Sequence, residues 1–109
     1  MSRVDKINSL LLQELAKQIA LKVTLPDSLI TISYVECSPD LRTAKVGVSV
    51  LPENHSGSAL KKLRQEQKNI SASLRKQLNL KFIPNFNWQI DEREGRAAKL
   101  EQALKELKQ

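Results

Sequence analysis

One alternating segment, residues 43–51, constrains the fold of this chain more than any other stretch. A turn signal at Pro39-Asp40 precedes the segment, and Pro52 follows it. Apolar side chains recur at every second position, which is typical of a strand with one buried face; they are Ala44, Val46, Val48 and Val50. Because the alternate positions are mixed in character, the pattern favours a sheet that helices cover on one face only.

The flanking segments supply the other elements. Residues 2–23 carry apolar side chains three and four positions apart, and Ser2 can cap the helix that this spacing predicts. Residues 29–35 alternate Ile30, Ile32 and Tyr34 against polar neighbours, which predicts a strand antiparallel to residues 43–51. A second amphipathic helix is predicted over residues 59–78, capped by Ser58, and a third over residues 92–108.

Residues 85–91 form the last predicted strand, and the helical connection before it is long enough for a right-handed parallel crossover. Phe86, Trp88 and Ile90 share one face of this strand. Trp88 is therefore interpreted as a core residue, against the alternative of a base-stacking platform, because stacking platforms combine aromatic and basic residues and this strand has no basic residue.

Composition limits the classes of protein. The chain has 109 residues, enough for one domain with one core. Cys37 is the only cysteine, which excludes an intrachain disulfide and multi-cysteine metal sites. No apolar run approaches the ~20 residues of a membrane span and the beginning of the chain lacks a signal peptide pattern, so we expect a cytoplasmic protein without cofactor or metal.

The positive charge is concentrated in one region. Residues 61–81 contain seven basic residues and one acidic residue, Glu66, which accounts for the whole net charge of +6. At ~100° per residue, four of the basic residues fall on one edge of the predicted helix, well away from its apolar stripe. This basic stripe comprises Lys61, Arg64, Lys68 and Arg75. It predicts a face that binds a polyanion such as RNA, the plainer alternative being a solvated helix surface.

Little in the sequence points to catalysis. His55 is the only histidine, and we interpret it as a solvated loop residue without chemistry, as a lone loop histidine usually is. Glu36 and Asp40 flank a loop but lack an adjacent histidine, a metal-ligand set or a glycine-rich phosphate loop. We therefore expect a protein that is not an enzyme.

The element order predicts an α+β fold of the type II KH class, αββααβ, with a three-stranded sheet covered on one face and an extra C-terminal helix. Two segments resemble the ribosome-binding factor A family: residues 35–50, with Ser38-Pro39-Asp40-Leu41 and Ala44-Lys45-Val46, and residues 80–91, with Leu80-Lys81 and Pro84. Arg3-Val4 and Pro26 also match the family pattern. The resemblance spans essentially the whole chain, residues 1–109, as a single domain.

The resemblance implies a bacterial assembly factor that binds the immature 30S small ribosomal subunit, assists maturation of the 5′ region of its rRNA and leaves before translation. It implies that the small subunit, through its rRNA and neighbouring proteins, is the partner of a monomeric protein. Binding would use the basic stripe and further basic residues, acting by phosphate neutralisation. The further residues are Lys76, Lys81, Arg42, Lys45, Arg3 and Lys6. The alternative function is a protein–protein adaptor whose basic helix docks on an acidic partner.

Two departures from related patterns concern the middle of the crossover helix. The three glycines are Gly47, Gly57 and Gly95, so the Gly-x-x-Gly clamp of RNA-binding KH domains is absent. The small residues Ala-x-Gly typical of the family are replaced by Glu66-Gln67-Lys68, and its usual arginine by Ser71. Because Gln67 interrupts the apolar stripe, we predict two helices, residues 59–67 and 70–78, joined by a bend that places basic residues around a convex corner.

Overall fold

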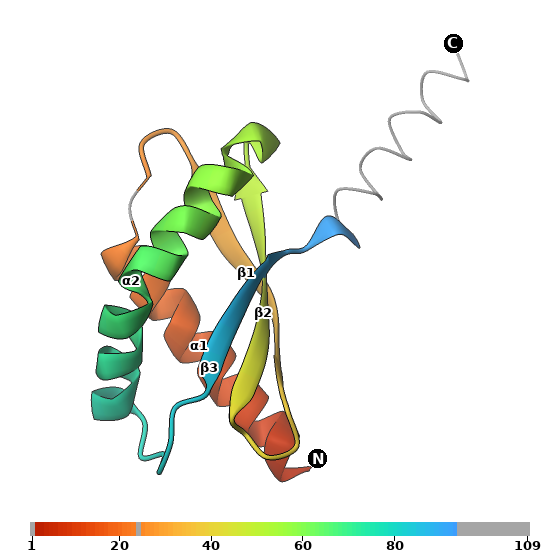
Figure 1. Cartoon of the computed structure of the whole chain (residues 1–109), viewed down its shortest axis with the longest axis vertical. Helices are drawn as coiled ribbons and strands as arrows, with labels where there is room; N and C mark the ends of the chain where they lie inside the picture. Colours follow the sequence, from red (N-terminus) through yellow and green to blue (C-terminus); the bar gives the residue numbers. More distant parts are fainter. Residues whose placement is uncertain (1, 24, 94–109) are drawn as a thin grey trace.

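The computed structural model describes residues 2–23 and 25–93. A three-stranded sheet of order β1-β2-β3 carries two long helices on one face (Figure 1). The elements are α1 (Arg3–Lys22), β1 (Leu29–Cys37), β2 (Thr43–Leu51), the 3-10 helix η1 (Glu53–His55), α2 (Ser56–Gln77) and β3 (Asn85–Ile90). β1 is antiparallel to β2 and β3 is parallel to it. The predicted α+β class is confirmed; most of the predicted C-terminal helix, residues 92–108, lies outside the described residues.

Helix α1 begins with the predicted cap. The Ser2 hydroxyl accepts a hydrogen bond from the Asp5 amide at 3.1 Å, and the Asp5 carboxylate accepts one from the Ser2 amide at 3.3 Å. This reciprocal pair satisfies two amides that a helix start otherwise leaves unpaired. The buried face of α1 consists mainly of Ile7, Leu11, Leu15 and Ile19.

The alternation of β2 is confirmed, because its four predicted core residues are at most 4% exposed. In β3, Phe86 and Trp88 are 6% and 3% exposed. The core interpretation of Trp88 is therefore confirmed. The α1 and α2 side chains complete one continuous core over this face of the sheet.

The expected face of Tyr34 was wrong, because β1 contains an irregularity. Ile32 pairs with Val48 and Tyr34 pairs with Gly47, so Ser33 is an extra residue between two consecutive partners. Such a bulge exchanges the faces of all later side chains. Val35, and not Tyr34, is therefore buried in the core, while the Tyr34 ring lies over Gly47 on the face without helices.

The predicted division into two helices was wrong: α2 is one α-helix of 22 residues that runs through Glu66-Gln67-Lys68 without interruption. Its axis nevertheless changes direction about halfway along (Figure 1). The side chain of Gln67 explains why the helix is not interrupted. Its Oε1 accepts a hydrogen bond from the Trp88 indole Nε1 at 3.2 Å. Gln67 thus satisfies a donor that burial of Trp88 would otherwise leave unpaired, and the gap in the apolar stripe does not break the helix.

The start of α2 lies three residues before the predicted one. The helix begins at Ser56 and continues from η1, with His55 at its N-cap position, so Ser58 is not the cap. Nor is His55 a solvated residue as expected, because it is half-buried and its Nδ1 lies within hydrogen-bonding distance of the Ser28 hydroxyl. This contact ties the α1–β1 connection to the beginning of α2.

Candidate nucleic-acid interface

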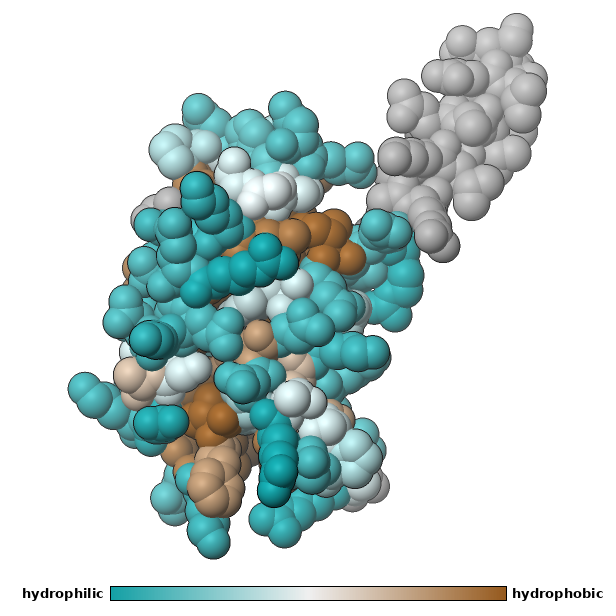
Figure 2. All heavy atoms as spheres, viewed as in Figure 1, coloured by the Kyte–Doolittle hydropathy of each residue, from teal (hydrophilic) through white to brown (hydrophobic). Residues whose placement is uncertain are grey.

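The basic stripe lies on the solvent-facing edge of α2. The helix buries Ala59, Leu63, Ile70 and Leu74, and all four stripe residues are exposed. On a continuous helix the stripe residues fall within a sector of about 60°, on the side away from the buried residues. Hydrophilic side chains accordingly cover most of the α2 side of the molecule (Figure 2).

The positive charge of the stripe is not neutralised inside the described part of the chain. Glu66 is the only acidic residue between Lys61 and Lys81, and its carboxylate lies 3.9 Å from Lys62, which is not a stripe residue. Within the described ranges, no stripe residue takes part in an ion pair. All four side chains are therefore available to phosphate groups.

A second basic group gathers at one end of the molecule. The start of α1, the β1–β2 loop and the α2–β3 connection meet there (Figure 1). Backbone and side-chain hydrogen bonds hold these three segments together: the Asn85 amide donates to the Arg42 carbonyl at 2.9 Å, and the Cys37 amide donates to Asn8 Oδ1 at 2.9 Å. We call this group the basic end; its exposed members are Arg3, Lys6, Arg42, Lys76 and Lys81.

Lys45 belongs to neither surface. It alternates with the buried Ala44 and Val46, so its side chain lies on the face of the sheet without helices, next to Glu36 and Asn87 of the neighbouring strands. The ten basic residues selected from the sequence are thus divided among an α2 edge, one end of the molecule and the open sheet face.

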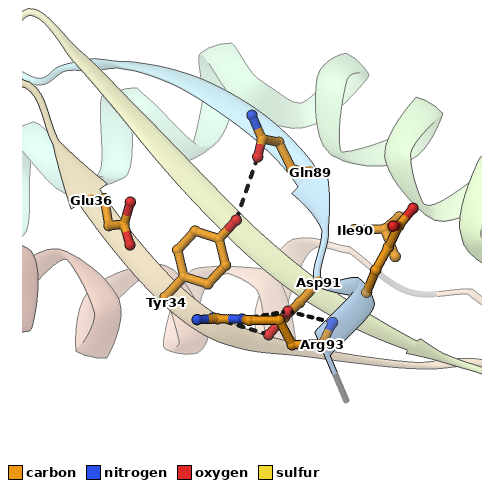
Figure 3. Close-up of a pocket in the computed structure, with 7 residues that line it drawn as sticks. Tyr34, Glu36, Gln89, Ile90, Asp91 and Arg93 are labelled. Atoms are coloured by element: carbon orange, nitrogen blue, oxygen red, sulfur yellow. Dashed lines mark hydrogen bonds and ion pairs between the residues drawn. The ribbon is translucent and has the colours of Figure 1, made fainter. Parts of the chain in front are cut away.

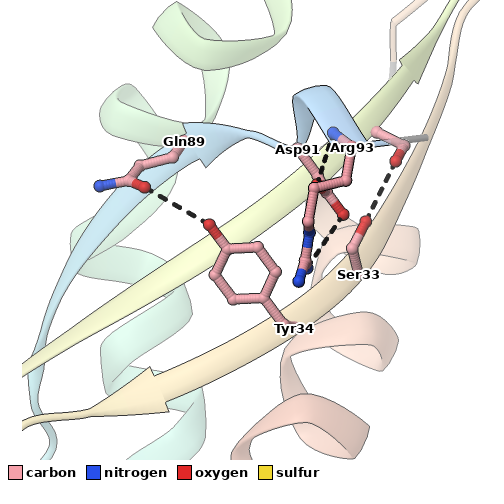
Figure 4. Close-up of polar contacts among 6 residues, drawn as sticks. Ser33, Tyr34, Gln89, Asp91 and Arg93 are labelled. Atoms are coloured by element: carbon pink, nitrogen blue, oxygen red, sulfur yellow. Dashed lines mark hydrogen bonds and ion pairs between the residues drawn. The ribbon is translucent and has the colours of Figure 1, made fainter. Parts of the chain in front are cut away.

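The open face carries a polar arrangement that the sequence did not reveal. A hollow of about 500 Å³ is lined by residues that include Tyr34, Glu36, Gln89, Asp91 and Arg93 (Figure 3). Arg93 lies over the Tyr34 ring at 4.7 Å, and the Tyr34 hydroxyl donates a hydrogen bond to Gln89 Oε1 at 3.4 Å (Figure 4). The bulge in β1 brings Tyr34 to this face, and simple alternation of polarity does not signal a bulge.

Asp91 and Arg93 form the ion pair of this face. Arg93 Nε donates to Asp91 Oδ1 at 3.0 Å, and the Asp91 side chain is 5% exposed against 70% for Arg93. The hydrogen bond from Arg93 lowers the pKa of the Asp91 carboxyl, although desolvation of the carboxyl opposes it. Because Glu36 and Glu92 add further negative charge, the hollow is a poor place for a phosphate.

Groups suited to catalysis are sparse in residues 2–23 and 25–93. Burial raises the pKa of the Cys37 thiol, which disfavours the nucleophilic thiolate. Among these residues no group of three or more histidine, cysteine, aspartate or glutamate side chains is arranged to hold a metal ion. In the same ranges no helix is both long enough and apolar enough to cross a membrane.

The three-stranded sheet, the two helices on one of its faces and the exposed basic edge place the chain among small α+β domains of the KH-like class. A family model described as ribosome-binding factor A matches residues 3–104. A Thermodesulfovibrio yellowstonii protein named ribosome-binding factor A is 36% identical over 107 residues, which cover 97% of this chain and 91% of the relative. An Akkermansia muciniphila protein of the same name is 27% identical over 105 residues, covering 96% and 84%.

The fold agrees with these sequence matches. The crystal structure of ribosome-binding factor A from Thermus thermophilus superposes with a TM-score of 0.72 at 22% identity, covering 82% of this chain and 97% of the other. The chain belongs to the ribosome-binding factor A family.

Proposed function

We propose that this protein is a non-catalytic RNA-binding assembly factor that binds the immature 30S small ribosomal subunit as a monomer and assists maturation of the 5′ region of its rRNA. Membership of a family whose relatives are named ribosome-binding factor A supports a ribosomal partner. The RNA contact is proposed from the basic stripe: four exposed cations lie on one edge of α2, and none of them forms an ion pair within residues 2–23 and 25–93.

The surface proposed for RNA is the edge of α2 continued by the basic end. The acidic hollow on the open sheet face disfavours phosphate there, which leaves the helical side as the electrostatically suitable one. Each stripe residue neutralises a phosphate and releases counterions, so four contacts give a logarithmic salt slope of roughly −3 on single-stranded RNA.

The first test changes the charge of the stripe. The variant Arg64→Glu, Lys68→Glu, Arg75→Glu should bind RNA more weakly and reduce the salt slope by about 2, because each lost phosphate contact on a single strand removes about 0.7. The melting temperature should hardly change, since exposed charges contribute little to stability. An unchanged salt slope would discard the stripe as the binding surface.

A single-residue pair controls for net charge. Lys68→Glu and Lys17→Glu alter the net charge equally, and the Lys17 side chain is 66% exposed on α1, outside the proposed surface. Only Lys68→Glu should weaken binding. Equal weakening would indicate that the net charge of the protein, and not the stripe, governs binding.

The second test identifies the partner. A tagged copy of the chain, sedimented through a gradient of cell lysate, should migrate with free small subunits and not with translating ribosomes. Recovery of an acidic protein in fractions free of rRNA, with no small subunits bound, would instead support the adaptor function.

A further inference from the structure

Phe82 is an exposed aromatic side chain in a chain with few aromatic residues. The sequence contains one Trp, one Tyr and two Phe. Phe86 and Trp88 are 6% and 3% exposed and Tyr34 is half-buried, whereas Phe82 is 73% exposed. The Phe82 ring therefore contributes little to the core, and it is the one mostly exposed aromatic side chain among the described residues.

The α2–β3 connection holds this ring outward. Leu80 and Ile83 pack against the core on either side of Phe82, and Pro84 is buried. The Asn85 amide then bonds to the Arg42 carbonyl at 2.9 Å, which fixes the end of the connection. Phe82 is thus presented on an anchored segment. An apolar patch ringed by hydrophilic side chains is visible near the end of the molecule where α2 finishes (Figure 2).

The surroundings of the ring are cationic. Lys81 Nζ lies 5.6 Å from the Phe82 ring centroid, a cation–π distance. Arg75 and Lys76 lie in the last turn of α2, just before the connection. No acidic residue occurs in the sequence between Glu66 and Asp91. A ligand of this site must therefore offer an aromatic or apolar surface to the ring, and it must also carry negative charge.

An unpaired nucleotide has both properties. Proteins that bind single-stranded nucleic acid stack exposed aromatic rings on bases and neutralise the adjoining phosphates with basic side chains. A paired base in a duplex does not offer its face in this way. An apolar protein partner fits less well, because Lys81 lies over the ring and the charged residues closest to Phe82 in the sequence are basic, so that these charges would have to be desolvated.

We propose that Phe82 is a base-stacking residue: an unpaired nucleobase of RNA lies on the Phe82 ring, and Lys81, Arg75 and Lys76 hold the phosphates beside it. This proposal rests on the proposed RNA-binding function and adds the chemical form of the ligand, which is an unpaired segment.

The test uses three substitutions at this position. Phe82→Ala removes the ring, Phe82→Leu keeps an apolar side chain without an aromatic face, and Phe82→Trp keeps an aromatic face. The probes are a 12-nucleotide single-stranded oligoadenylate RNA and a 12-base-pair RNA duplex, with binding followed by fluorescence anisotropy over a range of salt concentrations. Because Phe82 is exposed, the melting temperatures of all three variants should equal that of the parent.

Phe82→Ala and Phe82→Leu should bind the oligoadenylate about 5- to 100-fold more weakly, with an unchanged salt slope, since stacking on one base is neutral in charge. Both should bind the duplex as the parent does, and Phe82→Trp should keep its affinity for the single strand. In Phe82→Trp the new indole is exposed, so its solvent-like emission should be quenched by the oligoadenylate while that of the buried Trp88 persists.

Oligoadenylate binding by Phe82→Leu at parental affinity would overturn the stacking proposal, as would equal losses on single strand and duplex. If the stripe variant loses RNA binding while Phe82→Ala does not, the proposed function stands and only the stacking proposal is rejected. If Phe82→Ala and Phe82→Leu lose small subunits but keep oligoadenylate, Phe82 contacts a protein and the proposal is wrong. A parent protein that binds neither probe would contradict both proposals.

Discussion

The contact between Tyr34 and Gly47 provides a direct test of the bulge in β1. A β-carbon at position 47 would lie within 2.5 Å of Cδ1 and Cζ of the Tyr34 ring, far inside the ~3.5–4.0 Å of ordinary carbon contacts. No described glycine has a positive φ, so Gly47 is needed for space and not for backbone conformation. Gly47→Ala should therefore displace the Tyr34 ring.

The expected magnitude follows from the contacts that the ring would leave. Overpacking typically destabilises by about 1–3 kcal/mol. The displaced ring would also leave the Gln89 hydrogen bond and Arg93, an exposed cation–π contact worth roughly 0.5–1 kcal/mol. We expect Gly47→Ala to lower the free energy of unfolding by about 1–3 kcal/mol, and not more, because the ring borders solvent and can rotate.

The sign should reverse when the ring is removed. In a Tyr34→Ala background the three atoms nearest to the new β-carbon, all in the Tyr34 ring, are absent. Alanine should then stabilise the strand by about 0.5–1 kcal/mol relative to glycine. The coupling energy between positions 34 and 47 should thus be about 1.5–4 kcal/mol.

Urea unfolding followed by the fluorescence of Trp88, the only tryptophan, measures these free energies. Gly57→Ala is the matched control: no atom lies within 4 Å of a β-carbon at this position in α2, so it should be neutral or stabilising by up to about 1 kcal/mol. If Gly47→Ala destabilised both backgrounds equally, Tyr34 would not lie over Gly47 and the bulge would be misplaced.

Three further outcomes test the core and the open face. Trp88→Ala should destabilise by about 3–5 kcal/mol, as large-to-small core changes do, measured by thermal circular dichroism; a loss under 1 kcal/mol would contradict its burial. Gln67→Ala should cost about 1–3 kcal/mol because the indole N–H loses its acceptor, whereas the exposed Gln77→Ala should be near neutral in the same urea titration. Folding lowers the pKa of the Asp91 carboxyl, so its contribution to stability is present above the unfolded pKa of about 4 and is lost as pH falls through the folded pKa. Asp91→Asn should therefore reduce the loss of stability at acid pH, measured by urea unfolding from pH 2 to 7. An unchanged loss of stability at acid pH would exclude this role.

The sheet, the first helix and the core strand of Trp88 could be predicted from the sequence because their signals are local. The side chains of β2 alternate at a period of two, and those of α1 recur at three and four, so each segment identifies its own buried face. The capping box at Ser2 and Asp5 is equally local. These features need no knowledge of the partner segments.

The bulge at Ser33 could not be predicted in this way. Ile32, Tyr34 and Val35 are all apolar or aromatic, so the alternating pattern allows either Tyr34 or Val35 on the buried face of the strand. Pairing with β2 decides which of the two side chains is buried, because Gly47, which has no side chain, leaves room for the Tyr34 ring on the open face. That information lies in another strand, and one extra residue exchanged the faces of Tyr34 and Val35.

The error at Gln67 has a related cause and bears on function. A polar residue on the buried face of a helix suggests, from the sequence alone, that the helix is interrupted there. In the structure the Gln67 Oε1 instead accepts a hydrogen bond from the Trp88 indole N–H, which lies in β3. Because α2 is continuous, its basic stripe lies along one edge of a single helix. In the proposed function, binding and folding use different faces of the same helix, so we expect that stripe charges can be reversed without disturbing the buried Leu63 or Ile70. Loss of the Gln67–Trp88 hydrogen bond should instead lower the stability of the protein and leave the charge of the stripe unchanged, since it would weaken the packing of α2 against β3.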